Sequence, residues 1–159
     1  MYPEKFVFDS KNISIFYLGP LWEDFNTYNN SFYASLQGLT LRPNEEMETG
    51  DLSNASMLDE EFTNINYMIR YYKYGIGRAA DYFSQEIREK RFTKYDASKL
   101  VEQYDGVCSE IIINRFCEYV SINVEYFWEV VNKFTNNNLF EIKKGSRPIK
   151  NFISGYGVI

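Results

Sequence analysis

The sequence contains no histidine among its 159 residues. Histidine is the commonest general base in enzymes and the commonest side-chain metal ligand, so its absence removes the usual means for both kinds of chemistry. The only two cysteines, Cys108 and Cys117, lie nine positions apart within one expected helix. This is not the spacing of a zinc site, and a helix turns two such side chains to different faces. We therefore assign no residue as catalytic and none as a metal ligand.

Motifs for nucleotide binding and covalent catalysis are also missing. The sequence has no G-x-x-x-x-G-K-[ST] phosphate loop, no G-x-G-x-x-G following a strand and no G-x-S-x-G turn. It has no signal peptide and no apolar run of membrane-spanning length, so we expect a cytoplasmic chain without a membrane span. The net charge of −5 gives no support to a nucleic-acid partner, which would need a basic face.

Aromatic residues are abundant, with 14 Tyr and 13 Phe, and such rings supply much burial area per residue. A chain of 159 residues is long enough to bury a core of its own. Apolar residues recur at i, i+3, i+4 and i+7 over residues 21–36 and through most of residues 64–135, which is typical of amphipathic helices. We therefore expect one mainly α domain over residues 1–159, with about five helices and a helical core at 64–135.

Three segments outside this core differ in character. Residues 1–20 include a short apolar run, Ile13–Leu18, whose β-branched and aromatic content favours a short strand or the remnant of a hairpin. Residues 40–63 are acidic and rich in turn-forming residues, so we expect a long surface loop, either a solvated connector or a lid over a pocket. Residues 136–159 form a basic, loop-like tail, which we expect to be solvated or to pack on the acidic loop.

Two glycines, Gly75 and Gly77, interrupt the helical pattern. Each costs about 1 kcal/mol relative to alanine inside a helix, so a sharp bend or a close approach of backbone or ligand is the expected reason. Lys73 and Arg78 flank the backbone N–H groups where the second helix begins, and this favours a site for phosphate or carboxylate. In the alternative, structural interpretation, Arg78 pairs with Asp81 at i, i+3 and holds the bend.

The candidate substrate-binding residues surround these glycines or lie on the charged stripe that follows them. They are Lys73, Tyr74, Gly75, Gly77, Arg78, Asp81 and Arg88. Their chemistry is that of an anion site and not of a reaction centre.

The stretch Lys73-Tyr-Gly-Ile-Gly-Arg-Ala-Ala-Asp81, followed by Ile87-Arg88, Arg91 and Tyr104-Asp-Gly106, resembles the C-terminal part of the N-acetyl sugar amidotransferases. These are PP-loop enzymes that act in the biosynthesis of lipopolysaccharide and other bacterial surface and flagellar sugars. The resemblance spans roughly residues 15–140, and the block 73–106 is its specific portion.

This resemblance implies a division of labour. In such enzymes an N-terminal α/β domain binds ATP and Mg through a Ser-Gly-Gly-x-Asp-Ser loop and activates the acetamido carbonyl of the sugar. Ammonia from a separate glutaminase subunit then converts the acetamido group to acetamidino. The C-terminal helical part helps to shape the site for the nucleotide-linked sugar, and Lys73, Arg78 and Asp81 match its motif. The implied partners are a PP-loop ATPase domain or subunit, the glutaminase subunit and a nucleotide-linked acetamido sugar.

The chain departs from the family at two points. It contains no Ser-Gly-Gly-x-Asp-Ser loop, so no cofactor is expected in this chain and it should be inactive alone. Where the family usually has Arg-Ala-Thr-Asp-His, this sequence has Arg78-Ala-Ala-Asp-Tyr82. An isolated domain, a split subunit and a degenerate relative all fit, as does a non-enzymatic helical protein-interaction module. If the enzyme interpretation holds, an exposed apolar patch near Leu18 and Trp22 should mark the interface with the missing half.

Overall fold

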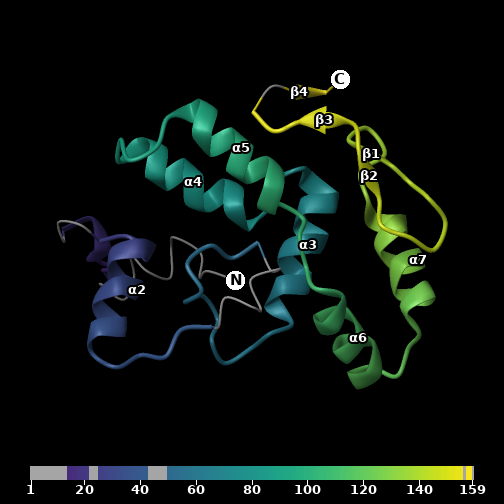
Figure 1. The fold of residues 1–159 in the computed structure, drawn as a ribbon, viewed down its shortest axis with the longest axis horizontal. Helices are drawn as coiled ribbons and strands as arrows, with labels where there is room; N and C mark the ends of the chain where they lie inside the picture. Colours follow the sequence, from purple (N-terminus) through teal and green to yellow (C-terminus); the bar gives the residue numbers. More distant parts are fainter. Residues whose placement is uncertain (1–13, 22–24, 43–49, 156, 159) are drawn as a thin grey trace.

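The computed structural model describes residues 14–21, 25–42, 50–155 and 157–158, and in these residues the fold is mainly α (Figure 1). The described part contains six α-helices, so the expected fold class is confirmed. The helices are α2 (Thr27–Leu36), α3 (Thr63–Tyr74), α4 (Arg78–Arg88), α5 (Lys94–Tyr104), α6 (Glu110–Tyr119) and α7 (Val124–Phe134), and a 3-10 helix, η1, covers Gly19–Leu21. The strands are β1 (Phe140–Glu141), β2 (Ile149–Lys150), β3 (Phe152–Ile153) and β4 (Gly157–Val158), paired antiparallel as β1 with β2 and β3 with β4.

Four of the helices begin where a side chain caps the first turn. Asn26, Thr93, Ser109 and Asn123 each accept a hydrogen bond from a backbone N–H group two or three residues further on. Such caps satisfy donors that the helix itself leaves unpaired. The caps at Thr93 and Asn123 each act within one turn of the helix that they begin. The longest helix in the described residues, α3, has 12 residues. Within the described segments none of the helices has the length and apolar character that a bilayer crossing requires.

The buried side chains form two clusters. The larger one lies between α3, α6, α7 and the C-terminal residues, and Met68 and Ile113 are fully enclosed in it. The smaller one joins α4 to α5 through Ala79, Phe83 and Ala97. Figure 1 shows α4 and α5 side by side, with α3 leading from them towards α6 and α7. The joint between α3 and α4 therefore connects the two clusters.

The C-terminal tail belongs to the larger cluster, so the expectation of a solvated tail is wrong. Phe140 and Phe152 are buried, and their ring centroids lie 5.2 and 6.0 Å from that of Tyr71. The Arg147 guanidinium donates to the backbone carbonyl of Cys108 at 2.6 Å and holds the tail against α6. The basic charge of the tail predicted a solvated segment. The tail is packed instead, because burial of two aromatic rings stabilises it while the charged side chains can stay at the surface.

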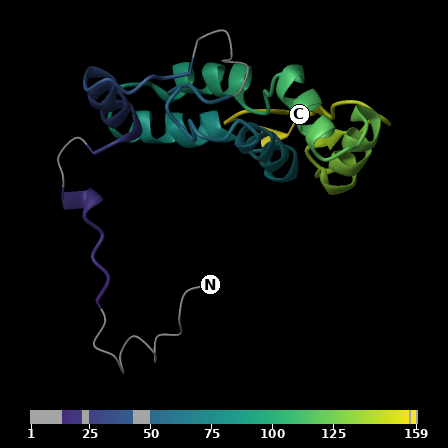
Figure 2. The same ribbon diagram turned by 90° about the horizontal axis from the view of Figure 1, so that it is seen from below.

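The N-terminal expectations also need correction. Residues 14–18 carry no regular secondary structure and lead into η1, so the described part of the expected strand, Ile13–Leu18, is not a strand. A strand needs a partner, and no other segment in the described residues pairs with it. Figure 2 shows this segment extending away from the helices. The helix expected over 21–36 begins only at Thr27, and Ile13 and Trp22 lie outside the described residues.

Residues 50–56 of the acidic loop are buried or partly buried, whereas residues 57–60 are exposed. Asp51 is only 3% exposed, and its carboxylate accepts hydrogen bonds from the Ser53 hydroxyl at 2.9 Å and the Ser56 N–H at 3.2 Å. A Cβ added to Gly50 would lie 2.8 Å from the Tyr104 carbonyl oxygen, so this glycine sits against the end of α5. Residues 43–49 of the predicted loop lie outside the described residues.

Replacing Phe152 with alanine tests whether the tail is part of the core. We expect Phe152→Ala to lower the free energy of unfolding by about 3–5 kcal/mol, because it empties a site among packed rings. Urea denaturation measures the difference, and Ile153→Ala, at the neighbouring position that is 47% exposed, is the control. Equal stability of the two variants would contradict the packed tail.

Candidate functional site

The joint between α3 and α4 is a sharp bend built on two glycines. Helix α3 ends where Gly75 takes a left-handed conformation, with φ of +73°, and its N–H donates to the Tyr71 carbonyl at 2.7 Å. Only glycine adopts this conformation without strain. A Cβ on Gly75 would also lie 3.0 Å from the side chain of Leu139. The bend that the two glycines predict is therefore present.

The backbone N–H groups at the start of α4 are occupied by the side chain of Asp105. The Gly77 N–H donates to Oδ2 of Asp105 at 2.9 Å, and the Ala80 N–H donates to Oδ1 at 3.2 Å. A Cβ on Gly77 would lie 2.5 Å from the same carboxylate, which explains the glycine. The anion site expected at this helix start is thus filled by a carboxylate of the chain itself, since N–H groups of this kind favour any nearby anion.

Asp105 is 7% exposed, and burial raises the pKa of its carboxyl group, opposed by the hydrogen bonds from the backbone at Gly77 and Ala80. The next residue, Gly106, has φ of +79°, and a Cβ there would lie 2.3 Å from the Tyr71 ring. The Asp105-Gly106 pair is therefore packed against the glycine joint, and the ends of the block 73–106 contact each other.

Asp81 pairs with Arg70 of α3 and not with Arg78. The Arg70 guanidinium donates to both carboxylate oxygens of Asp81, at 2.5 and 2.9 Å, across the bend. Hydrogen bonding from Arg70 lowers the pKa of the Asp81 carboxyl group, and the positive charges of Arg70 and Arg78 act in the same direction. The expected pair of Arg78 with Asp81 is not formed, although the expected role of Asp81 in holding the bend is found with another partner.

The other cations of the predicted site contact different groups. Arg78 donates to the Ser56 hydroxyl at 2.8 Å and lies over the ring of Tyr67 at 5.5 Å, so it holds the acidic loop. The Lys73 ammonium lies 5.5 Å from the ring centroid of Tyr74, and both side chains are exposed. Arg88 is exposed at the end of α4. Arg78, Lys73 and Arg88 therefore have different surroundings.

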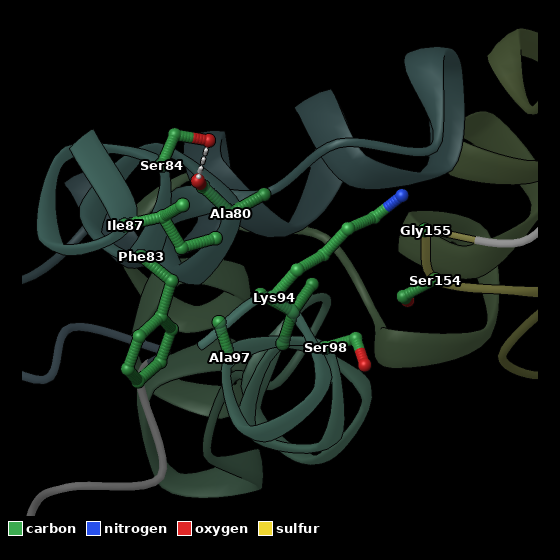
Figure 3. A pocket seen from close by; sticks show the side chains of 10 residues that line it. Ala80, Phe83, Ser84, Ile87, Lys94, Ala97, Ser98, Ser154 and Gly155 are labelled. Carbon is green, nitrogen blue, oxygen red and sulfur yellow. Dashed lines mark hydrogen bonds between the residues drawn. The ribbon is translucent and has the colours of Figure 1, made fainter. Parts of the chain in front are cut away.

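A groove runs beside the joint, between α4, α5 and the turn after β3 (Figure 3). It consists of two adjoining hollows of about 170 and 260 Å³. Both hollows are lined by Ala80, Val101, Ser154 and Gly155. Tyr74 and Gly75 line the second hollow, whereas the other five predicted site residues are not among the lining residues. Most of the side chains that line the groove were not among the predicted residues.

The sequence does hold a signal for part of this groove. Ala97 and Val101 belong to the apolar face of α5, and Lys94 and Ser98 lie on the same side because they are separated from these by three or four positions. The residues from the turn after β3 could not be found in this way, because the tail lies more than 50 positions further along the chain. Glu102 and Ser154 are also more than 50 positions apart in the sequence. The Glu102 carboxylate accepts a hydrogen bond from the Ser154 N–H at 3.1 Å.

The groove has room for a small ligand, and the described residues offer little to hold a metal ion or to act as a thiol nucleophile. Among them, no group of three or more Asp, Glu or Cys side chains could hold a metal ion. Burial raises the pKa of the Cys108 thiol to about 12, which makes it a poor nucleophile at neutral pH. The groove has mostly apolar walls with a few polar groups at its rim, which is typical of small-molecule binding sites.

The described residues form a mainly α domain with a groove between α4 and α5, and comparison with known proteins supplies its family. A family model described as the C-terminal domain of WbpG-like LPS biosynthesis proteins matches residues 25–153. The match covers well over half of the chain, so the chain belongs to this family, and the predicted resemblance to a C-terminal region of surface-sugar biosynthesis proteins is confirmed. No curated protein and no solved structure matches the chain.

Removing the Asp105 carboxylate tests its role at the start of α4. We expect Asp105→Ala to lower the free energy of unfolding by about 1–3 kcal/mol, because two backbone N–H groups lose their acceptor in a buried place. Asp59→Ala, at an exposed loop position, is the control in the same urea denaturation series. The interpretation fails if the two alanine variants unfold at the same urea concentration.

The ion pair of Arg70 and Asp81 predicts a pH dependence of stability. Because the pKa of Asp81 lies below its ordinary value of 3.8 in the folded chain, the contribution of the pair is complete above 3.8 and is lost as the pH falls through the lowered value. The pair is about 40% exposed, so Asp81→Asn should cost less than about 1 kcal/mol at pH 7. Unfolding of both proteins from pH 7 to pH 2 measures this cost, and a cost that does not shrink in acid would refute the assignment.

Proposed function

We propose that this chain is the substrate-side region of an ATP-dependent N-acetyl sugar amidotransferase in lipopolysaccharide or other surface-sugar biosynthesis. The reaction replaces the carbonyl oxygen of a sugar acetamido group with a nitrogen from ammonia and so forms an acetamidino group. The observation that carries this proposal is membership in the WbpG-like C-terminal domain family over residues 25–153. ATP and Mg would bind to a PP-loop domain or subunit, a glutaminase subunit would supply ammonia, and the assembly would work in the cytoplasm.

The structure suggests separate tasks for the predicted site residues. Tyr74 and Gly75 line the groove and are the members of the set that can touch a substrate there. Gly77 and Asp81 hold the bend through Asp105 and Arg70, and are positioning residues in this proposal. The groove itself is walled largely by the block 73–106, the specific part of the sequence resemblance.

An exposed apolar segment supports the need for a large partner. It comprises residues 15–21, and four of its side chains are 70–80% exposed, namely those of Phe16, Tyr17, Leu18 and Leu21. Helix α2 follows it without a single buried residue and with several exposed rings. Contiguous apolar surface of this kind marks interaction sites. The exposed side chains around Leu18 agree with the described part of the patch expected near Leu18 and Trp22, and we propose that this segment contacts the ATP-binding domain or subunit.

The same segment also favours a second candidate function, a non-enzymatic protein-interaction module. Such a module would use the apolar segment to bind its partner, but it would not need the groove. The two functions therefore differ in whether sugar conversion depends on this chain.

Reconstitution with a PP-loop subunit and a glutaminase subunit tests the proposal. We expect ATP, Mg, glutamine and a nucleotide-linked acetamido sugar to give the acetamidino product, detected by mass spectrometry, only when this chain is present. Replacing both Leu18 and Leu21 with aspartate should weaken subunit association at least about tenfold, because charges do not tolerate burial in an apolar interface.

Phe134→Asp is the matched control, since Phe134 is 62% exposed but lies at the end of α7, on the other side of the molecule from α2. A stable complex that converts no acetamido sugar would favour the interaction module. If the Leu18 and Leu21 variant associates as strongly as the unchanged chain, the apolar segment is not part of the interface.

A further inference from the structure

The groove between α4 and α5 has one cationic side chain among its lining residues, Lys94. Lys94 is exposed in the first turn of α5, and none of the ion pairs in the described part of the chain involves it. Figure 3 shows its amine reaching along the groove towards Ser154 and Gly155. An ammonium group without an acidic partner beside an apolar groove can bind an anionic group of a ligand.

The floor of the groove beside Lys94 is apolar and built from small side chains. Ala97 is 1% exposed, and Ala80 and Phe83 face it from α4. Two alanines leave room where larger side chains would close the space between the helices. The two hollows together reach the lower end of the range found for small-molecule sites, about 300–1,000 Å³. The floor therefore offers apolar contact to a small group such as a methyl.

Two hydroxyl groups on the rim have hydrogen-bonding capacity to spare. The Ser84 hydroxyl donates to the Ala80 carbonyl at 2.7 Å, and the Ser98 hydroxyl donates to the Tyr95 carbonyl at 2.8 Å. Because each hydroxyl has used its single proton, its oxygen is left as an acceptor. Acceptors at this place suit the O–H groups of a sugar or the N–H group of an amide.

We propose that this groove binds an N-acylated sugar phosphate. The acyl methyl group lies on the floor at Ala80 and Ala97, the sugar donates to Ser84 and Ser98, and Lys94 contacts the phosphate. The choice of an N-acyl sugar rests on the proposed function. That the ligand carries an anionic group and an apolar group is inferred from the lining of the groove. The proposed phosphate site therefore lies at the start of α5 and not at the start of α4, where Asp105 occupies the backbone N–H groups.

Calorimetry on the full chain with four probes separates these contacts. N-acetylglucosamine 1-phosphate carries every feature, glucose 1-phosphate lacks the acyl group, N-acetylglucosamine lacks the phosphate, and inorganic phosphate lacks the sugar. We expect the first to bind tightest. Lys94→Ala should weaken it about tenfold and leave the affinity for N-acetylglucosamine unchanged, since only the charge-assisted contact is lost.

Lys99→Ala is the matched control, because Lys99 lies on the same helix with its ammonium 4.0 Å from the ring centroid of Tyr95 and does not line the groove. Ser84→Leu fills the groove from an exposed position and should weaken both N-acetylated probes. Circular dichroism and urea denaturation establish that each variant is folded.

The groove assignment is wrong if the full chain does not bind N-acetylglucosamine 1-phosphate, if Lys94→Ala binds it as the unchanged chain does, or if inorganic phosphate binds equally well. These results leave the proposed amidotransferase function untouched, because product formation tests it separately. Conversely, Lys94-dependent binding together with a reconstituted complex that forms no acetamidino product would overturn the proposed function and keep the groove.

Discussion

The hydrogen bonds from the start of α4 to the Asp105 carboxylate determine the geometry of this part of the molecule. Asp105 follows α5 directly, so the bonds tie the end of one helix to the beginning of another. A carboxylate at this place both satisfies unpaired N–H groups and lies at the positive end of the helix dipole. Because α4 and α5 are the two long walls of the groove, the shape of the groove depends on the same contact.

This contact also limits where the chain can bind an external anion. The first turn of a helix offers few free N–H groups, and at α4 a buried side chain has taken two of them. A phosphate group would have to displace Asp105 and leave its carboxylate unpaired in an apolar place, which is costly. An anion is better placed at an exposed amine without a competing carboxylate, and Lys94 meets this condition.

The sequence predicted those features of the fold that depend on contacts between residues close together in the chain. The limits of α5 and α7 follow from apolar periodicity and from the caps at Thr93 and Asn123, which act within one turn. The pairing of Arg70 with Asp81 could not be predicted, because it depends on the angle between two helices. The burial of Phe152 and the capping by Asp105 are likewise contacts between distant positions, and a cap from 28 residues away has no local signature.

Helix α2 links the proposed interface to the proposed binding groove. Its 10 residues include no buried one, and a helix of this length is marginal in water without packing. Its N-cap residue, Asn26, donates from its side chain to Glu89 at the end of α4 at 3.1 Å. Arg91 forms ion pairs with both Glu89 and the buried Glu86 of α4. Glu86 lies one helical turn from Phe83, which lines the groove. A partner packed on α2, as proposed, would therefore stabilise the end of α4, because the Asn26–Glu89 hydrogen bond joins the two helices.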